Sequence, residues 1–218
     1  MEIVVAPDPS AVAADLLARR LRDAVRRRGS ASLALSGGST APPMLATLVD
    51  ADLPWRVVTA WQVDERIAPD GDEARNAGQL EVLPCRVVPM PVTARDLPAA
   101  GRRYAASLPE RFDVVHLGLG ADGHTASWPP GDARPIRSES DVELVDEFNG
   151  WPRMTLTRQV VNGARGRVVL TTGAAKRPMV ERWLLADPDL PIAVVRRSGT
   201  VLVVDEAAAP DVPIHDRD

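Results

Sequence analysis

The sequence predicts an α/β protein in which helices cover both faces of a mostly parallel sheet. Short apolar runs typical of buried strands alternate with longer segments whose apolar residues recur at helical spacing. Several of these runs lead directly into turns rich in glycine and serine, as expected at the carboxyl ends of parallel strands. No internal repeat or linker interrupts the alternation, so we expect residues 1–218 to form a single domain.

Each expected element carries its own local signals. Asp8 or Ser10 can cap the first long helix, and Gly29 ends it. Pro42 and Pro43 fit the first turn of the second helix, where a missing N–H leaves no bond unmade. In chain order, the expected strands are 3–6, 32–35, 57–63, 87–90, 113–119, 154–156, 167–172, 192–195 and 201–204. The expected helices run from the cap to Gly29, after residue 40 through Val49, at 94–107, within 157–166 and at 176–185, with polar loops at 68–75 and 129–140 and a polar tail after Pro210.

The overall composition narrows the class of protein. A net charge of −4 argues against nucleic acid or a membrane surface as a partner. The arginine clusters 19–20 and 26–28 belong to the solvated face of an amphipathic helix. No basic segment followed by an apolar one marks a signal peptide, and no apolar run approaches membrane-spanning length. We therefore expect a cytoplasmic protein.

The cysteine and histidine content argues against a metal centre. Cys85 is the only cysteine, so neither an intrachain disulfide nor a thiolate cluster can form. His116, His124 and His215 are scattered without the spacing of metal ligands. We expect no metal site.

The segment 114–127, VVHLGLGADGHTAS, contains the first candidate site. An apolar strand runs into a glycine-rich turn, and Asp122 and His124 follow just past the strand's carboxyl end. Histidine is the side chain best suited to moving a proton near neutral pH. A surface turn with an incidental histidine is the alternative, and it would be the better interpretation of a histidine standing alone.

The segment 33–40, LALSGGST, predicts an anion-binding turn. A strand leads into two glycines between hydroxyl residues and then into a helix, whose amino terminus favours negative charge. Neither the P-loop spacing nor the dinucleotide fingerprint is present. An ordinary capped turn is the alternative. The residues of this turn are Ser36, Gly37, Gly38, Ser39 and Thr40.

Three basic residues near strand ends can also reach an anion. Arg66 follows a strand in the run Asp64-Glu65-Arg66 and can bind a phosphate or carboxylate in bidentate fashion, although a surface ion pair is the commoner role of such a run. Lys176 follows another strand at a helix start and is the only lysine in the chain, although a solvated lysine is the simpler interpretation. Arg153 opens a strand, and its sequence position favours anion binding and a purely structural role equally.

Together these segments resemble one family, the 6-phosphogluconolactonases. The resemblance implies a Rossmann-like three-layer α/β/α fold with a mostly parallel sheet, similar to glucosamine-6-phosphate deaminase. It also implies hydrolysis of 6-phospho-D-glucono-1,5-lactone in the oxidative pentose phosphate pathway, without a required cofactor. The matching pieces are SGGST at 36–40, DER at 64–66, Asn76, GLGADGHTAS at 118–127, RMTLT at 153–157 and TGAAK at 172–176.

The resemblance also implies roles for single residues. We expect His124 to act as general base toward water, while Asp122 either orients the imidazole or shapes the turn. A phosphosugar lactone is the expected partner, bound by a monomer or a small homo-oligomer. The residues expected to contact the substrate or its phosphate are Ser36, Gly37, Gly38, Ser39, Thr40, Asp64, Arg66, Arg153 and Lys176.

Two other functions stay open at this point. A sugar-phosphate isomerase or deaminase of the same fold would resemble this chain in its DGH run. Residues 125–130 read TASWPP, however, and lack the glutamate expected in those enzymes. The second alternative is a non-catalytic sugar-phosphate-binding protein, which would bind 6-phosphogluconate without turnover.

Overall fold

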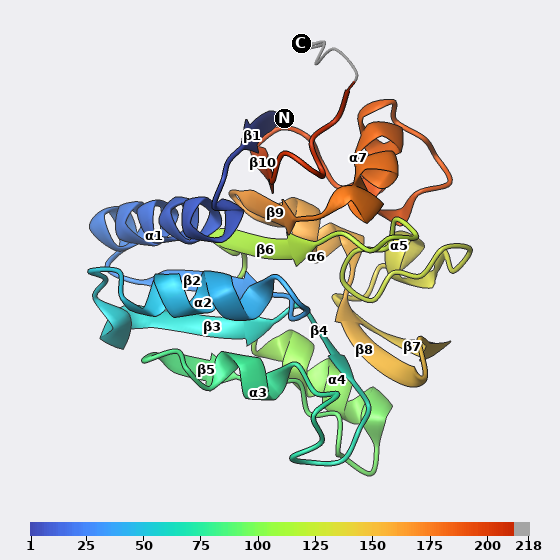
Figure 1. Ribbon diagram of the computed structural model, residues 1–218. Helices are drawn as coiled ribbons and strands as arrows, with labels where there is room; N and C mark the ends of the chain where they lie inside the picture. The colour runs from blue at the N-terminus through green and yellow to red at the C-terminus, as the bar shows by residue number, and fades with distance from the viewer. Residues whose placement is uncertain (212–218) are drawn as a thin grey trace.

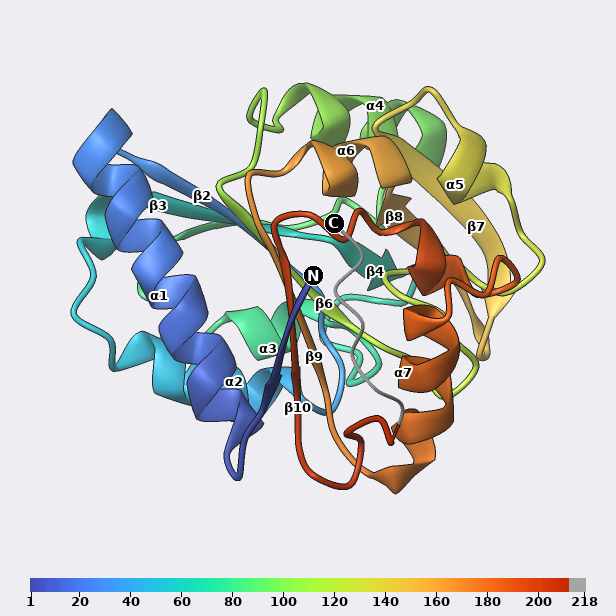
Figure 2. The ribbon, with the colours of Figure 1, turned by 90° about the horizontal axis from the view of Figure 1, so that it is seen from above.

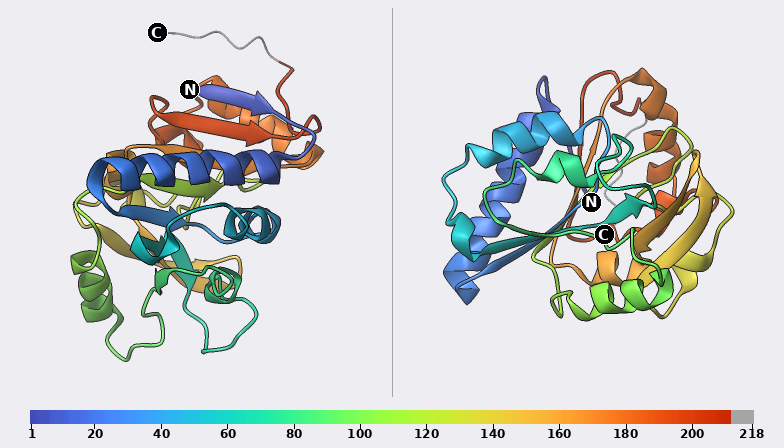
Figure 3. Two further views of the ribbon diagram at one scale, coloured as in Figure 1. Left: turned by 90° about the vertical axis from the view of Figure 1, so that its left-hand side faces the viewer. Right: turned by 90° about the horizontal axis from the view of Figure 1, so that it is seen from below.

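The computed structural model describes residues 1–211, and its centre is a seven-stranded sheet (Figure 1). The strand order is β1-β10-β9-β6-β2-β3-β5, and all neighbours are parallel, which confirms the expected sheet. β1 and β10, from opposite ends of the described chain, lie side by side at one edge (Figure 3). The strands are β1 (Glu2–Val5), β2 (Ala31–Leu35), β3 (Val58–Gln62), β5 (Arg86–Val88), β6 (Val114–Gly118), β9 (Arg167–Thr171) and β10 (Thr200–Val204).

Helices cover both faces of this sheet, which confirms the three-layer arrangement (Figure 2). Buried side chains of α1, α2 and α3 share one apolar cluster with one face, and those of α4, α6 and α7 share a second cluster with the other face. The helices are α1 (Pro9–Arg28), α2 (Ala41–Val49), α3 (Ala77–Leu80), α4 (Leu97–Ala106), α5 (Arg134–Arg137), α6 (Arg158–Gly163) and α7 (Arg177–Leu184), with short 3₁₀ turns η1 (Trp55–Val57), η2 (Ala174–Lys176) and η3 (Pro191–Val194).

The ends of α1 follow directly from the residues that the sequence places there. Asp8, rather than Ser10, is the cap, because its carboxylate accepts a hydrogen bond from the Ala11 N–H at 2.9 Å. Gly29 adopts the left-handed conformation, with φ of 77°, and its N–H bonds the carbonyl of Val25 at 2.8 Å. These two local signals fix both ends of the longest helix in the described chain.

A second, antiparallel sheet was not expected from the sequence. Its strand order is β4-β8-β7, with β4 at Asp64–Arg66, β7 at Val142–Phe148 and β8 at Trp151–Leu156. A turn at Asn149 and Gly150, which have φ of 52° and 82°, joins β7 to β8. Asn-Gly is the preferred pair for such a turn, because both central residues need positive φ.

Val63 joins the two sheets. It lies between β3 and β4 and is fully buried. Its N–H donates to the carbonyl of Leu35 in the first sheet at 2.9 Å, and its carbonyl accepts from the N–H of Leu156 in the second at 2.7 Å. The chain therefore passes from one sheet into the other without a loop, and β4 begins at the carboxyl end of β3.

Two sequence-based expectations need correction. The predicted strand at 192–195 is wrong, because this segment forms η3, in which Pro191 occupies the first turn and Ile192 donates to the carbonyl of Gly123. The expected loop at 129–140 contains the single turn of α5. The expected tail after Pro210 falls, apart from Asp211, outside the described residues, as does His215. Across residues 1–211, none of the helices has the length and apolarity needed to cross a membrane.

Candidate active site

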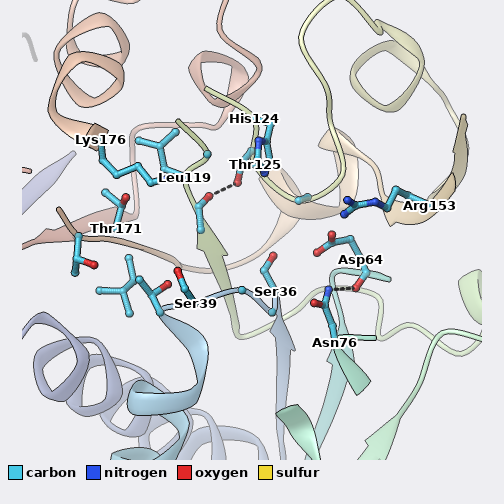
Figure 4. A pocket seen from close by; sticks show the side chains of 18 of the residues that line it. Ser36, Ser39, Asp64, Asn76, Leu119, His124, Thr125, Arg153, Thr171 and Lys176 are labelled. Carbon is cyan, nitrogen blue, oxygen red and sulfur yellow. Dashed lines mark hydrogen bonds between the residues drawn. The ribbon is translucent and has the colours of Figure 1, made fainter. Parts of the chain in front are cut away.

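A polar cavity opens where β2, β6 and β9 end, with β4 at its side (Figure 4). The turns after β2 and β6 meet there because these strands are neighbours and their crossovers run in opposite directions. This position is the one at which open parallel sheets bind ligands. The cavity is lined by Ser36, Gly37, Gly38, Ser39, Thr40, Asp64, Arg66, Asn76, Gly118, Leu119, Gly120, His124, Thr125, Ala126, Arg153, Leu170, Thr171, Thr172 and Lys176.

The structure therefore brings together segments that the sequence leaves far apart. Every residue predicted to contact the substrate or its phosphate lines this one cavity, and so does His124. Asp122 does not line the cavity, but its carboxylate contacts Nδ1 of His124. The cavity supplies hydroxyls, backbone amides, two guanidinium groups, an ammonium and an imidazole, a set suited to an anionic, hydroxylated ligand.

Asp122 and His124 form a hydrogen-bonded pair. The carboxylate of Asp122 contacts Nδ1 of the imidazole and also accepts from the His124 backbone N–H at 3.1 Å. Burial alone would raise the pKa of Asp122, but its hydrogen bonds and charge interaction with His124 outweigh this and hold the pKa below its usual value. A carboxylate only accepts, so the neutral imidazole carries its proton on Nδ1 and keeps Nε2 free.

Gly120 makes room for this pair. A Cβ atom at residue 120 would lie 2.0 Å from Nδ1 of His124 and 2.5 Å from a carboxylate oxygen of Asp122. No side chain fits at that separation, so the glycine is required by the packing of the imidazole over the turn. The Gly120 N–H also donates to the His124 carbonyl at 2.8 Å, which closes the turn.

Two buried hydroxyls fasten the histidine loop to its surroundings. Thr125 donates to the carbonyl of Gly118 at 2.8 Å, and Ser127 donates to the carboxylate of Asp64 at 2.7 Å. Both side chains are almost completely buried. The second bond connects the loop after β6 to β4, so His124 and Asp64 keep a fixed relation across the cavity.

Arg66 and Arg153 lie directly opposite each other in the β4–β8 register. Like charges placed opposite each other in a sheet repel. Burial lowers the pKa of Arg153 most, and the charge of Arg66 lowers it further, while Asp64 and Glu65 oppose both effects. An anion bound in the cavity would relieve this repulsion. Both arginines line the cavity, so their positive charge is concentrated in one part of it.

Lys176 lies on the other side of the cavity, with Thr171 beside it, while Arg153 and Asp64 lie opposite (Figure 4). Burial lowers the pKa of the Lys176 ammonium, and the charge of Asp122 opposes this only in part. Within residues 1–211, Lys176 forms no ion pair within 4 Å. The cavity thus presents positive charge at two separate ends.

The serine and glycine turn after β2 forms the floor between these ends. The Gly38 N–H donates to Gln79 at 3.1 Å. A Cβ atom at Gly37 would lie 2.2 Å from the side-chain oxygen of Asn76, so only glycine allows this approach. Three buried polar atoms of the lining have no hydrogen-bond partner within the described residues, namely Ser36 Oγ, Asn76 Oδ1 and Arg66 Nε.

Among the described residues, no three histidine, cysteine, aspartate or glutamate side chains gather in a way that could hold a metal ion. The lining of the cavity contains one carboxylate, that of Asp64, and one imidazole, that of His124.

The family model described as glucosamine-6-phosphate isomerases/6-phosphogluconolactonase matches residues 7–204. The chain belongs to this family. A 6-phosphogluconolactonase of Rhizobium meliloti is 33% identical over 221 residues, covering 90% of this chain and 94% of the relative. The crystal structure of a 6-phosphogluconolactonase from Shewanella baltica aligns with a TM-score of 0.84 at 26% identity, over 94% of this chain and 97% of the other. A monomeric glucosamine-6-phosphate deaminase has a TM-score of 0.82 at 20% identity over 95% and 98% of the two chains, a likeness of fold.

Several lining residues of this family member were not assigned to the site from sequence. They include Asn76, Thr125, Thr171 and Thr172, for which the sequence alone indicates no role. Thr125 and Thr172 lie inside matched motifs and Thr171 directly precedes one, so their place in the chain is the signal that could have assigned them to the site.

The interpretation of the DER run as a surface ion pair is wrong. Asp64 is 5% exposed and Glu65 is fully buried. The Glu65 carboxylate accepts from the N–H groups of Arg66, Asn76 and Ala77 at 2.7–2.8 Å. It also accepts from the side chain of Gln62 at 2.7 Å. In this family member Glu65 thus fixes the loop that carries Asn76 to the cavity.

Proposed function

We propose that this chain hydrolyses 6-phospho-D-glucono-1,5-lactone to 6-phosphogluconate, in the oxidative pentose phosphate pathway. Membership of the family and the relatives named 6-phosphogluconolactonase support this reaction. The observation that carries the proposal is the Asp122–His124 pair, which presents a free imidazole nitrogen to a cavity with positive charge at two ends. The substrate has two matching centres, a phosphate at one end and an electrophilic carbonyl at the other.

His124 acts as the general base. Its Nε2 removes a proton from water as the water oxygen bonds to C1 of the lactone. The resulting imidazolium is stabilised by Asp122 at Nδ1. The bond between C1 and the ring oxygen then breaks, and Nε2 returns the proton to that oxygen. One water is consumed, the ring opens to the carboxylic acid, and His124 ends as it began.

The phosphate binds at the Lys176 end of the cavity. There the ammonium lies beside Thr171, and the Ser36–Thr40 turn leads into the amino terminus of α2. The first turn of α2 offers no free amide, because Pro42 and Pro43 carry no N–H and the N–H of Ala41 donates to a carbonyl of the turn at 3.2 Å. The anion is therefore held by the Ser36–Thr40 turn and the ammonium, with the dipole of α2 adding to them. Binding energy gained at the phosphate, far from C1, orients the carbonyl toward His124.

Arg66 and Arg153 face the reacting end. Negative charge develops on the C1 oxygen during attack and remains on the product carboxylate. Two guanidinium groups held opposite each other stabilise both species through charge-assisted hydrogen bonds. Asp64, hydrogen-bonded to Ser127, offers an acceptor for a sugar hydroxyl.

The test is hydrolysis of the lactone itself. The lactone, generated in situ, should disappear faster than it does spontaneously, and the acceleration should vanish in His124→Ala. Release of ammonia from glucosamine 6-phosphate instead would identify a deaminase. Binding of 6-phosphogluconate without acceleration would identify a non-catalytic binding protein. Either result would overturn the proposal.

A further inference from the structure

The tip of the β7–β8 hairpin touches the catalytic pair without lining the cavity. Phe148, the last residue of β7, packs its ring against the imidazole of His124, with centroids 5.0 Å apart and planes at 82°. Phe148 is not among the residues that line the cavity. The contacts of Phe148 with the site are those with its neighbours His124 and Arg153.

Phe148 also contacts Arg153. The guanidinium carbon lies 5.4 Å from the centroid of the phenyl ring, within the range of a cation–π interaction. Nη2 of Arg153 donates to the Phe148 carbonyl at 2.8 Å, and Nε donates to the same oxygen at 3.2 Å. One residue thus contacts both the imidazole and a guanidinium group of the cavity.

The hairpin holds Phe148 in a fixed place. Phe148 is the register partner of Trp151 across the tight Asn149–Gly150 turn. Farther along β7, Val145 is buried and pairs with Arg153. The position of the phenyl ring is therefore set by the second sheet and not by the histidine loop itself.

The imidazole needs such a support. His124 stands in a turn with Gly120 and Gly123, and the contact of Asp122 with Nδ1 fixes one edge of the ring but leaves the ring free to tilt about it. A nearly perpendicular aromatic neighbour restricts that tilt. The direction of Nε2 follows from the two contacts together.

We propose that Phe148 is a positioning residue that holds the His124 ring, and with it Nε2, in the orientation that addresses the lactone carbonyl. The inference rests on His124 being the base of the proposed function. Removal of the Phe148 ring should lower kcat with little change in KM, because the ground-state contacts of the substrate stay in place.

The experiment compares Phe148→Leu, which removes the ring, with Phe148→Tyr, which keeps it. Phe148→Leu should lower kcat at least about tenfold, since misplacing a reacting group by a fraction of an ångström has effects of this order. Phe148→Tyr should restore most of the loss. Trp55→Leu is the matched control and should keep the parental kcat, because Trp55 is a partly buried aromatic residue that packs against the other apolar cluster.

NMR of the free protein tests the contact independently of any substrate. The ring protons of His124 should carry a ring-current shift that disappears in Phe148→Leu and persists in Phe148→Tyr, while those of the buried His116 stay unchanged. If the leucine variant does not fold, Phe148→Met serves in its place. Unchanged kcat, or equal losses in the leucine and tyrosine variants, would overturn the proposal. If the parent itself lacked lactonase activity, the proposed function would fail while the NMR result still reported on the contact.

Discussion

At the scale of single residues, the proposed base and the positively charged side chains lie in different parts of the cavity. Lys176 lies on one side of the cavity and Arg153 on the other (Figure 4). Arg66 is the register partner of Arg153, and His124 lines the cavity with Asp122 bonded to its Nδ1. This separation makes the roles distinguishable, because a change at each place should alter a different measurable quantity.

Removing the base should reduce turnover and leave binding almost intact. We expect His124→Ala to lower kcat about 100- to 10,000-fold, the usual contribution of a positioned general base. Asp122→Asn, which keeps the shape but not the charge, should cost less, about 10- to 100-fold. Steady-state kinetics combined with 6-phosphogluconate binding would check both values. A His124→Ala variant with parental kcat would remove His124 from the mechanism.

The two charged ends should respond to different parts of the ligand. Lys176→Ala should weaken binding of 6-phosphogluconate about 10- to 100-fold and leave gluconate binding unchanged, since the lost charge-assisted bond is to the phosphate. Arg66→Ala should weaken both ligands, because both carry the carboxylate. Calorimetry with the two ligands measures the difference. The reverse pattern would place the phosphate at the arginine end.

The depressed pKa of Lys176 adds a pH signature. Burial favours the neutral amine, so the ammonium is lost at a lower pH than in an ordinary lysine. Affinity for 6-phosphogluconate should therefore fall as the pH rises through that lowered pKa. Lys176→Arg keeps its charge throughout and should bind without this decline. An identical alkaline profile in the parent and the arginine variant would show that another group causes it.

At the scale of elements, the loop between β4 and α3 depends on one buried carboxylate. Glu65 accepts four hydrogen bonds, three of them from backbone N–H groups. Glu65→Gln would turn an amide group toward donors that it cannot satisfy. We expect a loss of about 3 kcal/mol in the free energy of unfolding. Glu73→Gln, an exposed change in the same loop, is the control in urea titrations. Equal stability of the two variants would show that the buried carboxylate is dispensable.

The elements differ in how far the sequence could predict them. α1 and β6 were predictable because the signals are local, a capping aspartate and a terminal glycine for the helix and an apolar run for the strand. The β7 strand was not, since Glu143, Asp146 and Glu147 interrupt its apolar residues and only one of its side chains is buried. Its stability comes from pairing with β8, which is a tertiary interaction.

The candidate site divides in the same way. The glycine turns, Arg66 and Lys176 could be proposed because each follows a strand, and parallel strands end at one edge. Phe148 could not be proposed from the sequence, because its contact with His124 depends on the register of the hairpin. The placement of Lys176 and of the two arginines on different sides of the cavity could not be predicted either, because it depends on how the strands are arranged in the sheets.

At the scale of the whole molecule, a buried histidine makes the fold sensitive to acid. His116 lies in the centre of the sheet, and burial lowers its pKa from 6.5 to about 4, with the backbone of Ser36 opposing only in part. Between these two values the unfolded chain binds a proton that the folded chain does not, so stability falls as the pH drops through this window. The total loss should be about 3 kcal/mol.

Denaturant titrations at a series of pH values would measure this loss. A His116→Leu variant removes the titrating group and should show a weaker dependence on pH in the same window. A dependence as steep as that of the parent would assign the acid sensitivity to carboxylates instead.

The position of Val63 has a consequence for how ligands enter and leave. Its backbone bonds to β2 on one side and to β8 on the other, so no hinge separates the two sheets. Opening by rotation of one lobe against another, as in two-domain enzymes, would break these buried bonds. Substrate exchange must then proceed through side chains and surface loops around a rigid frame. Product release should accordingly be little affected by solvent viscosity compared with enzymes that close by domain motion.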